Sequence, residues 1–313
     1  MSLSSVKQSK RHHNQIWLQI PYWLIAIIGL GLYVVFLITN RHPFDNIFIQ
    51  LQEGVRVTLR VSFTAYFNAV VIGLLIGLIR AYPIRQIKKG TDVVRLIIFQ
   101  ISTFYVEILR GLPILVVLLI IAFVIVPSVI GFIGEAQILP SDVTIAWFVG
   151  NDFGTDTDLI PEWRMIVDGR INITMRMFTN EARAIVALSL TYGAFLSEVF
   201  RAGIQSIGRG QSEAALSLGM TNVQTIWFVI LPQAIRRILP ALGNDLIAMI
   251  KDSALVAILA VRDITQLAKL SSGQSFLYME TYLVAASIYL FMTLIGSGIV
   301  KIIENRLQQS SHQ

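Results

Sequence analysis

Six charged side chains stand in or beside long apolar tracts of the chain. They are Glu107, Arg110, Glu198, Arg201, Lys251 and Asp252. A charge inside a membrane span is costly, and it usually faces the interior of a helix bundle or a water-filled cavity. Glu198 and Arg201 are three residues apart, as are Glu107 and Arg110, so each pair can interact along one helix face. Structural pairing and a polar passage for a solute therefore both remain open.

The composition indicates a membrane protein. Of 313 residues, 55% are hydrophobic and 14% are charged, with a mean hydropathy of +0.68. Ordinary soluble domains carry about a quarter charged residues. Runs of about 20 apolar residues are long enough to cross the hydrocarbon core as helices. We therefore expect an all-α integral membrane protein.

Six apolar tracts are the candidate spans. The third tract is too long for one straight helix, and Gly111 and Pro113 interrupt it, because proline breaks or kinks a helix. We expect an amphipathic segment up to Arg110 and a span from Leu112 onward. The tracts are Ile16–Ile38, Val55–Ile79, Val93–Ile133, Ala184–Ile204, Ile238–Val261 and Tyr282–Ile303.

Loop charges predict the orientation, since short cytoplasmic loops are rich in Lys and Arg. The N-terminal tail is basic, and so is the connection from Arg80 to Arg95. Between Glu135 and Glu181 acidic residues predominate, so this segment is expected outside. Six crossings then place both termini in the cytoplasm, in a multi-pass protein of the plasma (inner) membrane.

The stretch "GRGQSEAALSLGM", Gly208 to Met220, predicts a short cytoplasmic helix. Ser212 is a candidate N-cap and Gly219 suits a left-handed C-terminal cap. Thr221 and Gln224 form a candidate capping box for a second helix. Small side chains on the first helix would let another protein approach closely.

These residues resemble the EAA loop of the membrane subunits of ABC importers. "ILPQAIRRILPAL" follows the helix, and three other segments are similar to the polar amino-acid permease branch: "VEILRGLPILVVLL" (106–119), "TYGAFLSEVFRAGI" (191–204) and "LIAMIKDSALVAIL" (246–259). The residues that match the EAA loop are Gly210, Gln211, Glu213, Ala214, Ala215 and Gly219.

The resemblance implies a five-helix permease core with one added N-terminal transmembrane helix. Residues 1–53 would form a cytoplasmic tail, the extra helix and the first outer loop. Residues 54–313 would form the transmembrane domain, with an outer insertion at about 134–182 and the coupling loop at about 206–238.

The resemblance also implies partners. Such permeases pair with a second permease, the same or homologous, bind two ABC ATPase subunits through the EAA loop, and receive substrate from an extracytoplasmic binding protein. The chain has no G-x-x-x-x-G-K-[ST] phosphate loop. We therefore expect no cofactor and no enzymatic activity in this chain, with ATP and Mg²⁺ bound by the ATPase partner.

A polar amino acid would need side chains of both signs in the passage, because it carries an ammonium and a carboxylate. Lys251 is the favoured contact for the carboxylate, and Glu198 or Glu107 for the ammonium. Tyr192 and Ser197 are candidates to line the passage. The full candidate set is Glu107, Arg110, Tyr192, Ser197, Glu198, Arg201, Lys251, Asp252 and Ser253.

Other function classes lack support in the sequence. Four histidines and no cysteine make a metal site unexpected, and no G-x-S-x-G elbow indicates a hydrolase. The net charge of +6 lies in loops that flank spans, where topology and anionic headgroups explain it without nucleic acid. The alternative is a stand-alone secondary transporter or channel for small polar solutes, which often shows internal repeats in its hydropathy. We see no convincing repeat.

Overall fold

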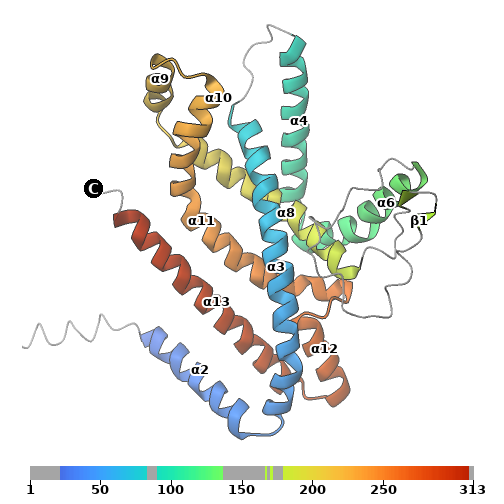
Figure 1. Ribbon diagram of the computed structural model, residues 1–313. Coiled ribbons are helices and arrows are strands. Elements are labelled where there is room, and N and C mark those ends of the chain that lie inside the picture. The colour runs from blue at the N-terminus through green and yellow to red at the C-terminus, as the bar shows by residue number, and fades with distance from the viewer. Residues whose placement is uncertain (1–21, 83–89, 137–165, 168–169, 172–178, 310–313) are drawn as a thin grey trace, which may run out of the picture.

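The computed structural model describes residues 22–82, 90–136, 166–167, 170–171 and 179–309. These residues are almost wholly helical (Figure 1), so the predicted all-α fold class is confirmed. The elements are α2 (Tyr22–Asn40), α3 (Phe44–Ala81), α4 (Gly90–Gly111), α5 (Ile114–Ile120), the π-helix η1 (Ile121–Ile125), α6 (Val126–Ala136), the paired strands β1 (Ile166–Val167) and β2 (Arg170–Ile171), α8 (Asn180–Gln205), α9 (Arg209–Ser217), α10 (Asn222–Gln224), the π-helix η5 (Thr225–Ile230), α11 (Leu231–Asp252), the 3₁₀-helix η6 (Ser253–Leu259), α12 (Ile264–Ser275) and α13 (Tyr278–Gln309).

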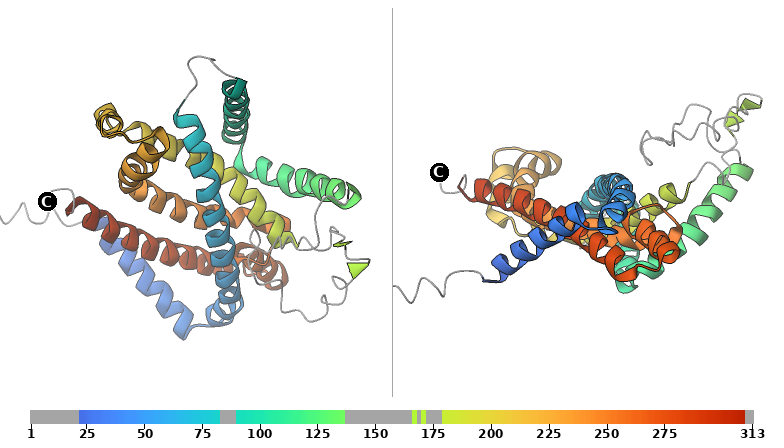
Figure 2. Two further views of the ribbon diagram at one scale, coloured as in Figure 1. Left: turned by 45° about the horizontal axis from the view of Figure 1, so that its top comes forward. Right: turned by 90° about the horizontal axis from the view of Figure 1, so that it is seen from below.

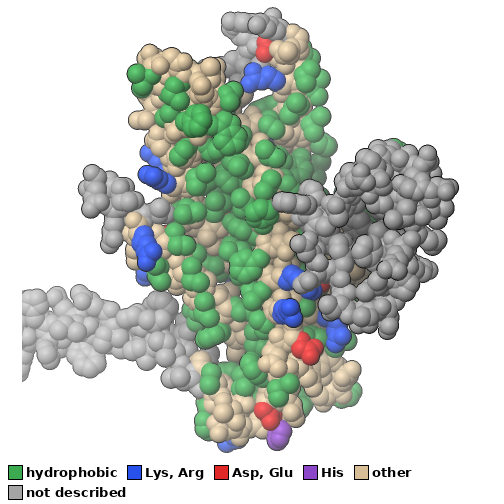
Figure 3. Space-filling view, in the orientation of Figure 1, with side chains coloured by type: hydrophobic (Ala, Val, Ile, Leu, Met, Phe, Trp, Pro, Cys, Tyr) green, Lys and Arg blue, Asp and Glu red, His purple; other side chains and the backbone are tan. Residues whose placement is uncertain are grey.

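Three helices of the described ranges are long and apolar enough to cross a membrane, namely α3, α8 and α13. The pair formed by α4 and Ile114–Ile130 also meets the criteria, but it is bent by 118° at its break. This bend, next to Pro113, confirms that the third apolar tract is not one straight span. Hydrophobic side chains cover much of the face over α3 (Figure 3), as expected for a surface that meets lipid.

Two predicted boundaries differ from the structure. Residues 44–53, expected in the first outer loop, belong to α3, which continues for 38 residues. The fifth tract was expected to be one helix from Ile238 to Val261. Instead, α11 spans Leu231–Asp252, and a 3₁₀-helix follows it to Leu259. This segment ends at Ala260, whose φ of 57° is left-handed and terminates the helix.

The most extensive helix–helix contact among the described residues joins α3 to α8. A Cβ atom on Gly73 would lie 2.8 Å from Cβ of Leu196, and one on Gly77 would lie 2.9 Å from the carbonyl oxygen of Ser197. Small residues at such positions let membrane helices approach closely. The two helices cross each other (Figures 1 and 2), and their contact forms the centre of the main hydrophobic core.

A second core joins α12 to α3 and α13 at the opposite end of the bundle from α9 (Figure 1). A Cβ atom on Gly54 would lie 2.6 Å from the amide nitrogen of Ile264, which donates to Oγ1 of Thr58 at 3.3 Å. The buried carboxylate of Asp263 caps α12 by accepting from the amide of Gln266 at 2.8 Å. Burial raises the pKa of Asp263 from 3.8 to about 6.

The additional N-terminal helix is present as α2, which packs beside α3 and α13 (Figure 2). Its predicted first residues, from Ile16, lie outside the described residues. The same holds for most of the predicted outer insertion. Its last residues enter α8, where Glu181 accepts two hydrogen bonds of 2.7 Å from the guanidinium of Arg60 on α3.

Candidate functional site

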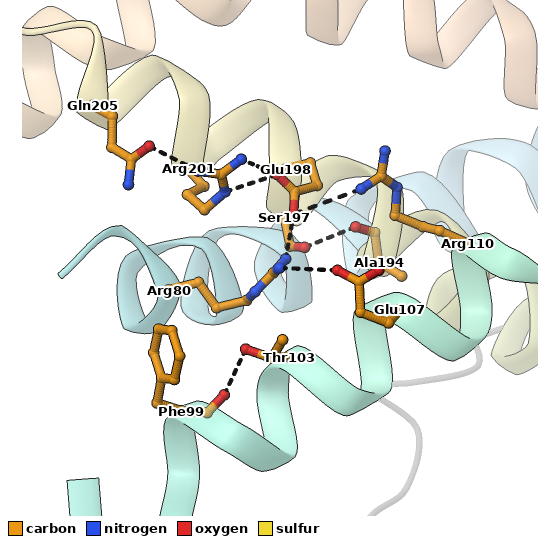
Figure 4. Close-up of polar contacts among 10 residues, drawn as sticks. All are labelled: Arg80, Phe99, Thr103, Glu107, Arg110, Ala194, Ser197, Glu198, Arg201 and Gln205. Atoms are coloured by element: carbon orange, nitrogen blue, oxygen red, sulfur yellow. Dashed lines mark hydrogen bonds and ion pairs between the residues drawn. The ribbon is translucent and has the colours of Figure 1, made fainter. Parts of the chain in front are cut away.

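A cluster of five charged side chains joins α3, α4 and α8, with Glu198 at its centre (Figure 4). Nη1 of Arg80 donates to one carboxylate oxygen of Glu198 at 2.5 Å, and Nε of Arg201 donates to the other at 2.8 Å. Nη1 of Arg110 lies 3.6 Å from Glu198, and Nη2 of Arg80 lies 3.5 Å from Glu107. Glu198 thus contacts three guanidinium groups.

Four members of this cluster were predicted as charges of interest, but Arg80 was expected in a cytoplasmic loop. In the structure Arg80 lies in the last turn of α3, and its side chain is only 8% exposed. Its burial could have been predicted from the spacing of Gly73, Gly77 and Arg80. Gly73 and Gly77 lie seven and three residues before Arg80, so all three share one helix face. Because that face packs against α8, Arg80 points toward Glu198.

The prediction that these charges pair along one helix holds for one of the two pairs. Arg201 does pair with Glu198 within α8, three residues apart. Glu107 and Arg110, however, contact different partners, Arg80 and Glu198 respectively. The cluster is therefore an interhelical network rather than two separate local pairs.

A second polar group lies between α8 and α11. The hydroxyl of Tyr192 donates to Oδ2 of Asp252 at 2.7 Å. Asp245 precedes Asp252 by seven residues, which places both carboxylates on one face of α11. The hydroxyl of Tyr66 on α3 donates to the carbonyl oxygen of Leu242 at 2.5 Å. Two carboxylates and two tyrosine hydroxyls, from three helices, therefore belong to this polar group. The sequence analysis did not identify Asp245 and Tyr66.

Aromatic contacts connect this group to the charged cluster. The rings of Tyr192 and Phe195 have centroids 6.2 Å apart, and the guanidinium carbon of Arg110 lies 5.9 Å from the centroid of Phe195. The second distance is within the range of a cation–π interaction. Polar and aromatic groups thus extend from Glu198 to Asp252.

Three other predicted residues have different surroundings. Lys251 is exposed, and within the described residues it makes no ion pair or hydrogen bond. The hydroxyls of Ser197 and Ser253 are buried and donate to backbone carbonyls three residues earlier, those of Ala194 at 2.7 Å and Ile250 at 2.8 Å. In this conformation the two serines stabilise backbone rather than present a free hydroxyl.

The predicted cytoplasmic helix is α9, and its ends differ in part from the prediction. The N-cap is Gly208, with φ −59° and ψ 140°, so the prediction of Ser212 was wrong. The extended backbone at Gly208 starts the helix one turn earlier. Gly219 has the predicted left-handed conformation, with φ 83°. The capping box of Thr221 and Gln224 is also confirmed.

Most of α9 is exposed, and it lies at the end of the bundle beside α10 (Figure 1). Ala215 is the exception, being 4% exposed where the helix packs on η5. Gln211, Glu213 and Ala214 face solvent. Large apolar side chains are exposed in the same region, namely Leu216, Leu218, Val223, Trp227 and Phe228.

A family described as "Binding-protein-dependent transport system inner membrane component" matches residues 73–309. This range includes the charged cluster, the Tyr192–Asp252 contact and α9. The chain belongs to this family. It is a membrane permease subunit of an ABC importer, and the resemblance seen in its motifs is confirmed.

Individual relatives align with more than four fifths of this permease. It is 29% identical to the probable amino-acid permease protein YxeN of Bacillus subtilis (strain 168), over 84% of this chain and 93% of the relative. It is 32% identical to the putative glutamine transport system permease protein GlnP of Rickettsia typhi, over 82% of this chain and 91% of the relative. A crystal structure of an amino acid ABC transporter with histidines aligns with a TM-score of 0.57 and 30% identity, over 84% of this permease and 95% of that chain.

Proposed function

We propose that this permease forms the translocation path for polar amino acids in an ATP-driven importer. It receives substrate from an extracytoplasmic binding protein, pairs with a second permease subunit, and couples through α9 to a separate ATPase. ATP and Mg²⁺ bind to the ATPase, and this chain carries no cofactor. Both termini lie in the cytoplasm.

The observation that carries the coupling role is the surface of α9. Exposed apolar patches rimmed by polar residues mark sites where other proteins bind. Around α9 the apolar side chains Leu218 and Phe228 are 85% and 72% exposed, beside the polar side chains of Gln211 and Glu213. Trp227 adds an aromatic side chain, a type enriched at protein interfaces. This composition suits a docking contact with an ATPase.

The polar groups between α8 and α11 support the transport of a charged solute. Asp252 and Asp245 offer carboxylates for an ammonium, while exposed Lys251 offers a cation for a carboxylate. An amino acid carries both groups. Relatives of this permease include proteins named for amino-acid and glutamine transport, which agrees with this substrate class.

The decisive experiment reconstitutes the permease with an ATPase and a binding protein encoded beside it. Uptake of each of the twenty radiolabelled L-amino acids into vesicles is measured together with ATP hydrolysis. We expect uptake of one or a few polar amino acids that requires both Mg-ATP and the binding protein. Uptake that persists without ATP and without partner subunits would instead identify a stand-alone secondary transporter or channel.

A further inference from the structure

Side chains of α11 hold the connection between α8 and α9 at both of its ends. Nη1 of Arg237 donates to the carbonyl oxygen of Ser206 at 2.7 Å. Nε2 of Gln233 donates to Oε1 of Gln211, the third residue of α9, at 3.2 Å. Gln233 and Arg237 are four residues apart, so they lie on one face of α11. One helix face therefore contacts the connection before and after the turn that begins α9.

Arg237 donates to a backbone carbonyl at the end of α8 that has no amide partner within that helix. The last carbonyls of a helix lack amide partners within the helix, and their partial negative charge attracts cations. The hydroxyl of Ser206 donates to the carbonyl of Gly203 at 2.7 Å, and the amide of Ile207 donates to that of Ile204 at 3.3 Å. Arg237, which belongs to a different helix, supplies a charged donor for the carbonyl of Ser206.

The same region contains the closest approach of α11 to α8. A Cβ atom on Gly203 would lie 2.2 Å from Cγ2 of Ile238, the residue after Arg237. Downstream, α9 packs on η5, which continues directly into α11. The helix that carries the exposed docking surface is thus attached to α11 by chain continuity and by the contact of Gln233 with Gln211, while Arg237 holds the residue Ser206 just before it. Further along, α11 carries Asp245 and Asp252.

We propose that Arg237 is the positioning residue that transmits movement of α9 to α11, and through it to the carboxylates between α8 and α11. This inference rests on the proposed function, which makes α9 the contact with the ATPase. In this arrangement Arg237 touches neither solute nor nucleotide. It fixes the end of α8 to α11 directly before α9 begins, and Gln233 fixes the start of α9, so that displacement of α9 rotates or shifts α11 rather than bending the connection.

A cysteine introduced on α11 reports this movement, because the natural chain contains no cysteine. Asn244→Cys places a thiol at an exposed position next to Asp245. The rate of its modification by N-ethylmaleimide is measured in the purified permease–ATPase complex, with and without Mg-ATP and vanadate, which trap the ATPase. We expect trapping to change this rate. Adding Arg237→Gln should reduce the change by about fivefold or more, while the ATPase remains bound.

Two matched variants distinguish the transmission of movement from an effect on folding and from the mere loss of a positive charge. Arg236→Gln removes the same charge from the neighbouring residue, which is exposed and makes no hydrogen bond or ion pair in the part of the chain that the structure describes. It should retain the full change in modification rate. Arg237→Lys keeps a cationic donor for the Ser206 carbonyl and should restore most of the change.

The outcomes are distinct. The inference is overturned if Arg237→Gln responds to trapping like the unaltered complex, or if it loses the ATPase altogether, since Arg237 would then be a docking or folding contact. Should Arg237→Gln fail to fold, a folded Arg237→Lys complex that does not respond overturns it equally. If the Asn244→Cys reporter never responds although the ATPase hydrolyses ATP, the proposed coupling itself fails, independently of Arg237.

Discussion

Arg80 and Glu198 are 118 residues apart in the chain, yet Nη1 of Arg80 lies 2.5 Å from a carboxylate oxygen of Glu198. Both side chains are largely buried, at 8% and 16% exposure. A buried charge is tolerated only with partners, and removing one partner leaves the other uncompensated. This ion pair therefore connects the end of α3 to α8. Glu107 and Arg110 connect α4 to the same two side chains.

Glu198→Gln should destabilise the permease strongly, because it removes the only carboxylate that contacts Arg80, Arg110 and Arg201 together within the described residues. We expect a loss of about 3–5 kcal/mol in the free energy of unfolding. Glu107→Gln is the matched control, because Glu107 is 68% exposed and its contact is long. It should cost about 0–1 kcal/mol. Thermal unfolding in detergent measures both, and equal effects would contradict the central role of Glu198.

A larger side chain at either alanine of α9 should weaken docking through a different contact. Ala215→Leu should displace α9 from η5, because Ala215 is buried against that segment, whereas Ala214→Leu adds bulk to the outward face. Gly219→Val should strain the turn at φ 83°, which β-branched residues avoid.

All three variants of α9 are expected at normal abundance with weakened retention of the ATPase, measured by co-purification and by coupled uptake in vesicles. Removing the Glu213 carboxylate should have a milder effect, since exposed charge contacts are worth about 0–1 kcal/mol. Wild-type coupling in both the Ala215 and the Gly219 variants would make α9 a plain connector.

Lys251→Ala should lower uptake without impairing assembly. Lys251 is exposed and has no partner within the described residues, so its loss leaves no buried charge unpaired. If it binds the substrate carboxylate, uptake should fall by about tenfold at low substrate concentration. Lys301→Ala, which removes another exposed lysine, on α13, is the control and should transport normally. Normal uptake by Lys251→Ala would exclude this contact.

Cysteines introduced at Asp156 and at Gln211 should be modified from opposite sides of the membrane. Asp156 belongs to the acidic segment predicted outside and lies beyond the described residues, whereas Gln211 is exposed on α9. An impermeant thiol reagent added to intact cells should label only the cysteine at position 156. Labelling of both positions from one side would refute the predicted topology.

The stability of the permease should fall as pH rises from about 4 to about 6 through the titration of Asp263. Its pKa is about 6 in the folded state against an ordinary 3.8, so the folded protein binds more protons in this window. Asp263→Asn lacks this titration. Melting temperatures at pH 4.5 and pH 7 should therefore show the wild type losing stability relative to the variant. A pH-independent difference would disprove the titration.

The sequence located well those elements that residues close together in the chain determine. Long apolar runs identified α3, α8 and α13, and Pro113 marked the bend, because proline acts on its own helix. The left-handed turn at Gly219 and the capping box at Thr221 are likewise local.

What sequence reasoning missed depends on contacts between distant segments. The burial of Arg80 follows from the packing of its helix face on α8, and no run of neighbouring residues encodes it. Asp245 was overlooked because its role emerges only with Tyr192 and Asp252 nearby. The N-cap at Gly208 was missed because glycine offers no side-chain acceptor, which leaves backbone geometry as its only signal.

The close glycine-mediated contact of α3 with α8 has a consequence for how the chain is made. About 100 residues separate the end of α3 at Ala81 from the start of α8 at Asn180. At ordinary rates of synthesis, α3 waits roughly 5–20 s before its partner exists. During this time Arg80, which is buried in the finished permease, lacks its partner Glu198 on α8. Nascent α3 is therefore a segment that the insertion machinery must shield until α8 arrives.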